Sequence, residues 1–307
     1  MDDLLSKQGK TIRYLASILL NAEPGHRLVA MQQIADEQDV SVGTVQAAMQ
    51  YLQNEHIVQV ANRGRLGAFA QALDYPHLWA LARQRPMSAI LPMPYSLRVE
   101  GLATALRQAF DAHALDIQLR YMRGSTARIE RLTSGQCDWV ITSRYAAEAA
   151  AVSGFEVEPI LALGPGSYTI EHVLLIKGAD QLQPGMRVGI DTQSADHAYV
   201  VRLLSRGTPV SFVEIDYSTT IEQLLSGQID ATVWTEPDVP TLPEPFRALP
   251  VGATFAEDDK LGQLGEAVII GLPAYEGVAH VVQAVLAVDS VREVQQAVVE
   301  RQVRPTY

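Results

Sequence analysis

The sequence predicts an α/β protein with two similar lobes, preceded by a small domain of three helices and a β-hairpin. Three observations indicate this architecture. Beyond residue 86 the chain alternates strand-like and helix-like segments, a pattern typical of a parallel sheet with helices on its faces. Two stretches of that region resemble each other in sequence. The first 72 residues instead carry short helical patterns followed by two strand-like runs joined by a turn.

Length and composition indicate a folded protein of more than one domain. The chain has 307 residues, of which 48% are hydrophobic and 19% charged, a composition typical of globular proteins. It has one cysteine, Cys137, and no Cys-x-x-Cys pair, so we expect no internal disulfide and no metal site. No signal-peptide pattern and no apolar run of about 18 residues is present. We therefore expect a cytoplasmic protein that does not contact a membrane.

The net charge excludes a protein that binds nucleic acid through its overall field. Against 24 lysines and arginines stand 35 aspartates and glutamates, which gives −11. Residues 1–75 hold six basic and eight acidic side chains and are close to neutral. Any DNA contact must therefore come from a local cluster at the N-terminal end.

The N-terminal elements have the spacing of a helix-turn-helix with a wing. A helical pattern over residues 12–20 ends at Glu23-Pro24-Gly25, and a second short helix covers Met31–Glu37. After a turn, Ser41 is a suitable N-cap for a third helix, which places its apolar side chains on one face. Strand-like runs at residues 57–60 and 66–69 flank the turn Asn62-Arg63-Gly64-Arg65. Such a hairpin is typical of a wing.

This segment resembles the winged helix-turn-helix of GntR-type bacterial regulators. The resemblance covers RLVAMQQIADEQDVSVGTVQAAMQYLQNEHIVQVANRGRLGAFA, which begins at Arg27. Val42 and Gln46 stand where that family usually has arginines. The residues expected at DNA are those at the start of the third helix, on its exposed face and in the wing: Ser41, Val42, Thr44, Gln46, Gln50, Arg63 and Arg65. Because one such module has few basic residues, we expect a homodimer that binds two operator half-sites.

We place a connector after the wing and two lobes after the connector. Residues 73–86 are helix-compatible and bounded by Pro76 and Pro86. The predicted domains are therefore 1–72 for DNA binding, 73–86 as a helical connector and 87–307 for ligand binding. Within the last, strand and helix patterns alternate over residues 88–141 and again over 187–233. We assign lobe 1 to about 87–180 and 240–307, including strands at 246–251 and 267–271, and lobe 2 to about 181–239.

An internal repeat supports two lobes of one design. IERLTSGQCDWVIT, from Ile129, and IEQLLSGQIDATVW, from Ile221, agree at seven positions when offset by 92 residues. Each copy predicts a helix that ends at Ser-Gly, followed by a turn with an aspartate and a buried strand. Two α/β lobes built this way resemble type II periplasmic-binding-protein folds.

The whole chain resembles one family. The helix-turn-helix segment, LDYPHLWALARQ in the connector, and the later segments MPYSLRVEGLATAL and MRGSTARIE are similar to those of YhfZ-type transcriptional regulators. The resemblance implies the domain order given above and does not identify a ligand.

We expect a ligand site where the carboxyl ends of the strands of both lobes face each other. Hydroxyl groups and helix N-termini there suit an anionic group, and two arginines could hold a carboxylate or phosphate. The candidates on lobe 1 are Tyr95, Ser96, Arg123, Gly124, Ser125, Thr142, Ser143 and Arg144. Those on lobe 2 are Thr192, Ser194, Tyr217, Ser218, Thr235 and Glu236. Compared with amino-acid-binding members of the fold, the match at Thr142, Ser143 and Glu236 is partial.

Together these patterns predict a regulator whose DNA-binding heads respond to a small, anionic or amino-acid-like effector. We expect no catalytic residues and no cofactor, because paired carboxylates, a nucleophile with a base and a phosphate-binding glycine loop are all missing from the sequence. Two alternatives stay open, both on the same two-lobed fold with a relic winged helix: a non-regulatory binding protein and an enzyme.

Overall fold

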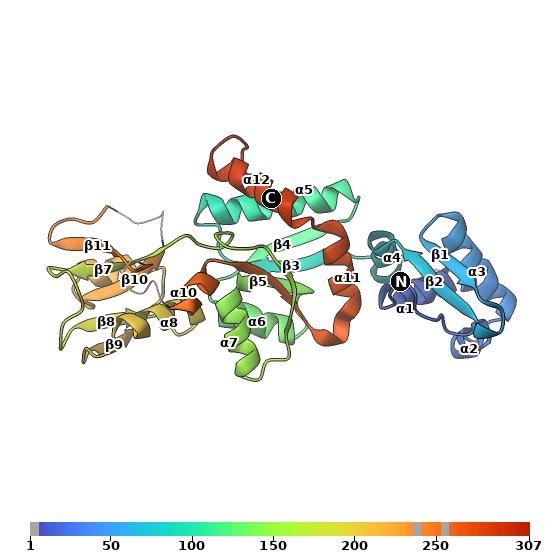
Figure 1. The fold of residues 1–307 in the computed structure, drawn as a ribbon, viewed down its shortest axis with the longest axis horizontal. Helices are drawn as coiled ribbons and strands as arrows, with labels where there is room; N and C mark the ends of the chain where they lie inside the picture. Colours follow the sequence, from blue (N-terminus) through green and yellow to red (C-terminus); the bar gives the residue numbers. More distant parts are fainter. Residues whose placement is uncertain (1–5, 236–240, 253–257) are drawn as a thin grey trace. The chain divides into compact units, whose positions relative to one another are not determined.

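The computed structural model describes residues 6–235, 241–252 and 258–307. The chain divides into two compact units (Figure 1). The first holds the chain up to Met87 together with Gln108–Gln118 and Pro273–Ala287. The second holds Ser88–Arg107, Leu119–Leu272 and Val288–Tyr307.

The first unit contains the expected helix-turn-helix and wing. Its helices are α1 (Lys7–Leu20), α2 (Met31–Gln38), α3 (Val42–Asn54) and α4 (Tyr75–Arg83). The wing is an antiparallel pair, β1 (Val58–Asn62) and β2 (Ala68–Leu73). The turn between α2 and α3 works because Asp39 adopts a left-handed backbone with φ 48°. The hydroxyl of Ser41 then caps α3 by accepting from the N–H of Thr44.

A helix near the C-terminal end of the chain also belongs to the first unit. The sequence patterns did not predict this assignment. This helix, α11 (Glu276–Val285), packs against the end of α1 and against α4. The His280 ring lies 4.6 Å from that of Tyr75, and its Nδ1 is 3.0 Å from the carbonyl of Leu20. Gly277 is required here, because a Cβ at this position would lie 2.6 Å from the Leu20 side chain.

The second unit is an α/β structure with two five-stranded sheets (Figure 1). Its further strands are β3 (Met87–Leu91), β4 (Ile117–Tyr121), β5 (Trp139–Ser143), β6 (Glu158–Ala162), β7 (His172–Lys177), β8 (Arg187–Ile190), β9 (Ser211–Glu214), β10 (Ala231–Thr235), β11 (Phe246–Pro250) and β12 (Ala267–Gly271). Its helices are α5 (Leu97–Ala112), α6 (Ser125–Thr133), α7 (Arg144–Val152), α8 (Ala195–Leu204), α9 (Thr220–Leu225), α10 (Asp259–Leu264) and α12 (Val288–Val299). The end of α5, from Gln108, and the start of β4, up to Gln118, fall within the first unit.

The two sheets share one topology. The first has the order β4-β3-β5-β12-β6, and the second, read the same way, β9-β8-β10-β7-β11. In each sheet the last strand of the βαβαβ unit, β5 or β10, is the middle strand. It pairs with one antiparallel strand, β12 or β7, which in turn pairs antiparallel with the edge strand β6 or β11. One assignment from sequence is therefore wrong: β7 and β11 lie in the sheet of lobe 2, although residues 172–177 and 246–250 were assigned to lobe 1. Their partners are distant in sequence, and a strand pattern does not specify its sheet.

The repeated aspartates have the same structural role in both lobes. The carboxylate of Asp138 accepts from the N–H of Ser88 at 2.7 Å, and that of Asp230 accepts from the N–H of Arg187 at 2.8 Å. The N–H of Asp138 also donates to the carbonyl of Ser88, and the N–H of Asp230 donates to the carbonyl of Arg187. The repeat thus fixes the start of the first strand of each lobe against the third.

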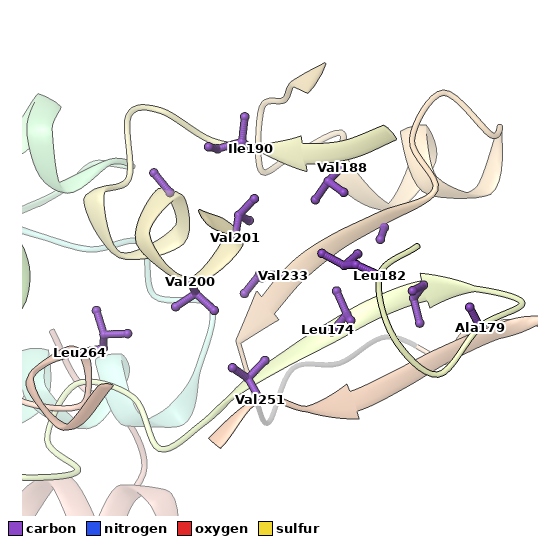
Figure 2. Packing of buried hydrophobic residues seen from close by; sticks show 13 residues of the cluster. Leu174, Ala179, Leu182, Val188, Ile190, Val200, Val201, Val233, Val251 and Leu264 are labelled. Carbon is purple, nitrogen blue, oxygen red and sulfur yellow. The ribbon is translucent and has the colours of Figure 1, made fainter. Parts of the chain in front are cut away.

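The core of lobe 2 lies between its sheet and α8 (Figure 2). Val200 and Val201 of α8 pack over Leu174 and Val233 from neighbouring strands, because the apolar residues of α8 recur on one face. Leu264 of α10 completes this cluster at one end. Within the described part of the chain, no helix is long and apolar enough to cross a membrane.

Candidate functional site

A cavity of about 190 Å³ lies between the two lobes of the second unit. Its wall includes residues from the strand ends and helix starts of both lobes, as expected for the carboxyl edges of facing sheets. Seven residues expected at the ligand line it: Tyr95, Ser96, Arg123, Gly124, Ser125, Ser194 and Tyr217. The structure therefore brings half of the fourteen candidates together in one place.

At the cavity edge, Arg123 links the two lobes. Its Nη1 donates to the Asp216 carboxylate of lobe 2, while Nε and Nη2 lie 3.3 and 3.0 Å from the hydroxyl of Tyr95. Hydrogen bonds from Ser218 and the contact with Arg123 lower the pKa of Asp216. The donors of Arg123 are thus directed to protein acceptors, and its side chain bridges the lobes.

Aromatic rings continue this bridge. The rings of Tyr95 and Tyr217, from opposite lobes, are nearly parallel, with centroids 6.5 Å apart and an angle of 14° between planes. Tyr217 in turn stacks on Trp234 at 4.3 Å. A residue from each lobe is thereby held at the same edge of the cavity.

Beneath the edge, the start of α6 meets the start of α8. The N–H of Thr126 donates to the carbonyl of Gln193, and the N–H of Ala195 donates to the hydroxyl of Ser125. Gly124 is necessary at this crossing, since its φ is +72° and a Cβ would lie 2.8 Å from the Gln193 carbonyl oxygen. These bonds hold the lobes against each other.

A buried arginine organises the lobe 1 side of the cavity. Arg128 is 2% exposed and donates to the carbonyls of Ile141 and Met122 and to the hydroxyl of Tyr168. Ile141 lies within β5 and Met122 directly follows β4, so the guanidinium ties backbone acceptors of two strands of the lobe 1 sheet to α6.

Two carboxylates from lobe 2 face the cavity. Asp196, on the first turn of α8, accepts from the hydroxyl of Ser143 across the lobes at 2.5 Å. Burial raises the pKa of Asp196 to about 6. Asp191 accepts the N–H of Gln193, and burial raises its pKa as well.

Two histidines in the wall are neutral near pH 7. Burial lowers the pKa of His172 and of His197 to about 4. The Nδ1 of His197 lies 3.1 Å from the N–H of Asp191, so it acts as an acceptor, and its Nε2 lies 3.2 Å from the carbonyl of Val233. His197 is thus hydrogen-bonded to backbone on both ring nitrogens.

Several expected ligand residues lie elsewhere. Arg144 pairs with Glu266 at the edge of a different cavity between α7, β6 and β12. Ser143 is buried behind Asp196, where it also caps α7, and Thr142 is fully buried in β5. The hydroxyl of Thr192 donates to Glu214, and that of Ser218 donates to Asp216. Thr235 ends β10, opposite His172 of β7, and Glu236 lies outside the described residues.

Sequence reasoning missed much of the charged wall, including Arg98, Arg128, His172, Asp191 and Asp196. Asp191 follows strand β8 directly, and Asp196 lies two residues after the candidate Ser194, at the start of α8. The criterion that selected Thr192 and Ser194 could therefore have included both aspartates. Arg98 lies two residues after the candidate Ser96, at the start of α5, so the same criterion could have included it. For His172 no such signal exists, because it begins a strand.

In the first unit, the residues expected to contact DNA are exposed or partly exposed, with Ser41, Val42, Thr44, Gln46 and Gln50 at α3 and Arg63 and Arg65 in the wing. Val45, Ala48, Met49 and Leu52 face the core of the unit, which leaves Gln46 and Gln50 of α3 exposed. Arg63 lies over the ring of Phe69 at 4.6 Å, and Arg65 is exposed at the turn of the wing. Between α3 and the wing runs a groove of about 510 Å³ that Gln46 and Gln50 line.

This groove also contains Arg27, which sequence reasoning did not single out as a DNA contact. Its guanidinium packs at the base of the wing, because Gly67, with φ +95°, leaves space for it. Arg27, Arg63 and Arg65 thus provide positive charge at the groove and the wing, whereas residues 1–75 as a whole hold six basic and eight acidic side chains.

The comparisons with known proteins agree with this architecture. A family model described as the YhfZ C-terminal domain matches residues 74–307, and a helix-turn-helix domain model matches residues 23–70. The chain is 29% identical over 305 residues to the Escherichia coli (strain K12) protein described as uncharacterized protein YhfZ, covering 99% of this chain and 98% of that one.

Among solved structures, that of YhfZ from Shigella flexneri is 27% identical and covers 73% of this chain and 100% of its own, with a TM-score of 0.52. The periplasmic aliphatic sulphonate binding protein SsuA from Escherichia coli is 16% identical and covers 71% of this chain and 76% of its own, with a TM-score of 0.51. The likeness to SsuA concerns the fold.

The fold is thus an N-terminal helix-turn-helix region followed by an α/β domain that resembles periplasmic binding proteins. The helix-turn-helix region suggests DNA binding. Because the C-terminal family model and the full-length similarity cover nearly the whole chain, this protein belongs to the YhfZ family.

Proposed function

We propose that the protein is a transcriptional regulator that binds DNA through its helix-turn-helix unit and responds to a small metabolite bound between its lobes. The cavity between the lobes carries this proposal, since it is charged, is lined from both sides and has a volume that suits a small molecule. In this proposal residues 1–72 bind DNA, 73–86 connect, and 87–307 bind the effector.

The path of the chain supports coupling between the two functions. Helix α11 belongs to the first unit, whereas β12 before it and α12 after it belong to the second. The chain therefore passes between the two units after residue 87, after Arg107 within α5, after Gln118 within β4, and on each side of α11. A ligand that favours one lobe arrangement could then alter the DNA-binding unit, provided that its affinity differs between arrangements.

The residues proposed to bind DNA are those at the start and on the exposed face of α3, together with the arginines of the wing: Ser41, Val42, Thr44, Gln46, Gln50, Arg63 and Arg65. The glutamines suit base edges and the arginines suit phosphates. Because each unit offers few cations, we propose a homodimer that binds two half-sites. We further propose that the protein acts by binding and not by catalysis, which the hydrogen-bonding of His197 to backbone supports.

The test begins with duplexes enriched by the purified full-length protein from a random DNA library, because the operator is not known. Fluorescence anisotropy then measures Kd of the best duplex for the wild type, for Arg63→Ala with Arg65→Ala, and for Arg304→Ala as a control at an exposed position of the second unit. We expect the wing variant to bind at least about tenfold more weakly and the control to bind normally.

The ligand part is tested on the same duplex. Compounds that raise the thermal midpoint in a screen of small carboxylates, amino acids and sugar phosphates are added to the anisotropy assay. A change of about fivefold or more in Kd is expected for an effector. Enrichment of no duplex, or an unchanged Kd with a compound that does bind, would contradict the proposal.

A further inference from the structure

Among the described residues, one charged side chain that lines the cavity, Arg98, has no oppositely charged partner. Arg98, in the first turn of α5 on lobe 1, donates from Nη1 to the carbonyl of Gly166. It forms no ion pair with a carboxylate of any residue that the structure describes, and Arg292 is the charged group that influences it. Burial, and then the repulsion from Arg292, lower the pKa of Arg98. Most of its N–H donors are therefore available to an anion in the cavity.

Across the cavity, Asp196 is an acid without a cationic hydrogen-bond partner. Its side chain is 8% exposed, and one of its oxygens accepts from Ser143. The other oxygen accepts no hydrogen bond from the described residues. Arg128 is the nearby cation, but its hydrogen bonds go to two carbonyls and to Tyr168. A buried carboxylate in this state is stabilised by a cationic donor.

The two groups come from different lobes and have opposite charges. A purely anionic ligand would meet the carboxylates of Asp191 and Asp196, and a purely cationic one would meet the guanidinium of Arg98. His172 and His197 add no charge near pH 7, since burial keeps both neutral. Arg123, the more obvious clamp in the sequence, is directed to Asp216 and Tyr95. A ligand that carries both charges satisfies both sides.

We propose that the cavity binds a zwitterion of amino-acid size, with its anionic group at Arg98 and its cationic group at Asp196. The cavity volume of about 190 Å³ is below the range of drug-sized pockets and suits a molecule of this size. The proposal rests on the proposed function in one respect, namely that this cavity is the ligand site. It assigns to Arg98 and Asp196 the contacts that lock a ligand to both lobes.

The experiment uses isothermal titration of the full-length protein at pH 7. The probes are the twenty standard L-amino acids one at a time, with succinate, inorganic phosphate and putrescine as representatives of the other charge classes. For the amino acid that binds best, the acid without its amino group and the amine without its carboxylate are also titrated. We expect one or more amino acids to bind, and both analogues to bind about 10- to 100-fold more weakly.

Two variants connect the charges to the residues. Arg98→Gln should weaken binding of the amino acid about 10- to 100-fold and leave the affinity for the amine analogue unchanged. Asp196→Asn should weaken binding of the amino acid and leave the affinity for the acid analogue unchanged. The controls are Arg144→Gln, which removes a guanidinium paired outside the cavity, and Asp180→Asn, which removes an exposed partner of Arg247. Thermal midpoints verify that all four variants fold, and Asp196→Asn retains the shape of the native side chain.

Each outcome bears on a different part of the reasoning. If succinate, phosphate or putrescine binds and no amino acid does, the zwitterion assignment is overturned while a ligand-responsive regulator still stands. The zwitterion assignment is also overturned if either analogue binds as tightly as the amino acid. It is overturned too if Arg98→Gln and Asp196→Asn both leave the affinity for the amino acid unchanged. If no probe binds but a selected duplex does, the zwitterion assignment and the ligand half of the proposed function are both overturned, and DNA binding remains.

Discussion

Replacement of Asp196 by asparagine should stabilise the protein in the absence of ligand. An unperturbed aspartate has a pKa of 3.8, whereas burial raises that of Asp196 to about 6. A tenfold change in an equilibrium constant corresponds to about 1.4 kcal/mol, so keeping this carboxylate ionised at pH 7 costs the folded state about 3 kcal/mol. Asparagine keeps the shape and an oxygen that can accept from Ser143, and it removes the charge. We expect a gain of about 1–3 kcal/mol.

The sign of the pH dependence makes this prediction specific. Because the folded pKa lies above the unfolded one, the neutral form of Asp196 favours folding below pH 3.8, and that contribution is lost as the pH rises through about 6. The stabilisation of Asp196→Asn relative to the wild type should therefore shrink from about 1–3 kcal/mol at pH 7 to about 0.5 kcal/mol or less at pH 4.

Urea denaturation followed by tryptophan fluorescence measures the advantage at several pH values. Asp216→Asn is the matched control, because its carboxylate is 65% exposed and its pKa is lowered by Ser218 and Arg123. That variant should not gain stability at pH 7. A loss of stability in Asp196→Asn, or a gain that does not change with pH, would refute the reasoning.

Three further predictions follow from other parts of the molecule. The half-buried ring of His172 is neutral near pH 7, because its folded pKa is lowered from the usual 6.5 to about 4. Its contribution to stability is therefore present above pH 6.5 and lost as the pH falls through 4. Between pH 7 and 4, urea denaturation should show the wild type losing about 3 kcal/mol more than His172→Gln. Gly101→Ala should destabilise by about 1–3 kcal/mol, because its Cβ would lie 2.8 Å from the Gln295 carbonyl oxygen, whereas Gly262→Ala, with open space, should be neutral or slightly stabilising in the same assay. Arg65→Ala should reduce the slope of log Kd against log salt for a selected duplex by about 1, and an unchanged slope would exclude a phosphate contact.

Local patterns determined most of the elements. Residues 97–112 form α5 and residues 187–190 form β8, inside the two regions where strand and helix patterns alternate. Their apolar spacing and the flanking turn residues specify helix or strand without distant partners. The repeat around Ile129 and Ile221 also predicted two lobes of one design, and the equal strand orders agree with it. Its aspartates were visible in sequence, although their contacts with Ser88 and Arg187 were not.

The residues of the candidate site were only partly predictable, because some of them depend on contacts between distant parts of the chain. Tyr95, Arg123 and Tyr217 follow strands, and the topology of a parallel sheet brings such positions to one edge. Arg144 follows a strand as well, but its side chain pairs with Glu266, 122 residues later in the chain. Such a pairing depends on which strands become neighbours, and a single sequence does not contain that information.

The sequence by itself determined that this protein has a helix-turn-helix with a wing and two similar α/β lobes, since these follow from periodicity, caps and turns over short distances. Only the tertiary structure decided that β7 and β11 belong to lobe 2, that α11 belongs with the first unit, and that Arg98 and Asp196 face one cavity. The physical reason is that strand pairing, helix docking and the balance of buried charges arise between residues far apart in the chain.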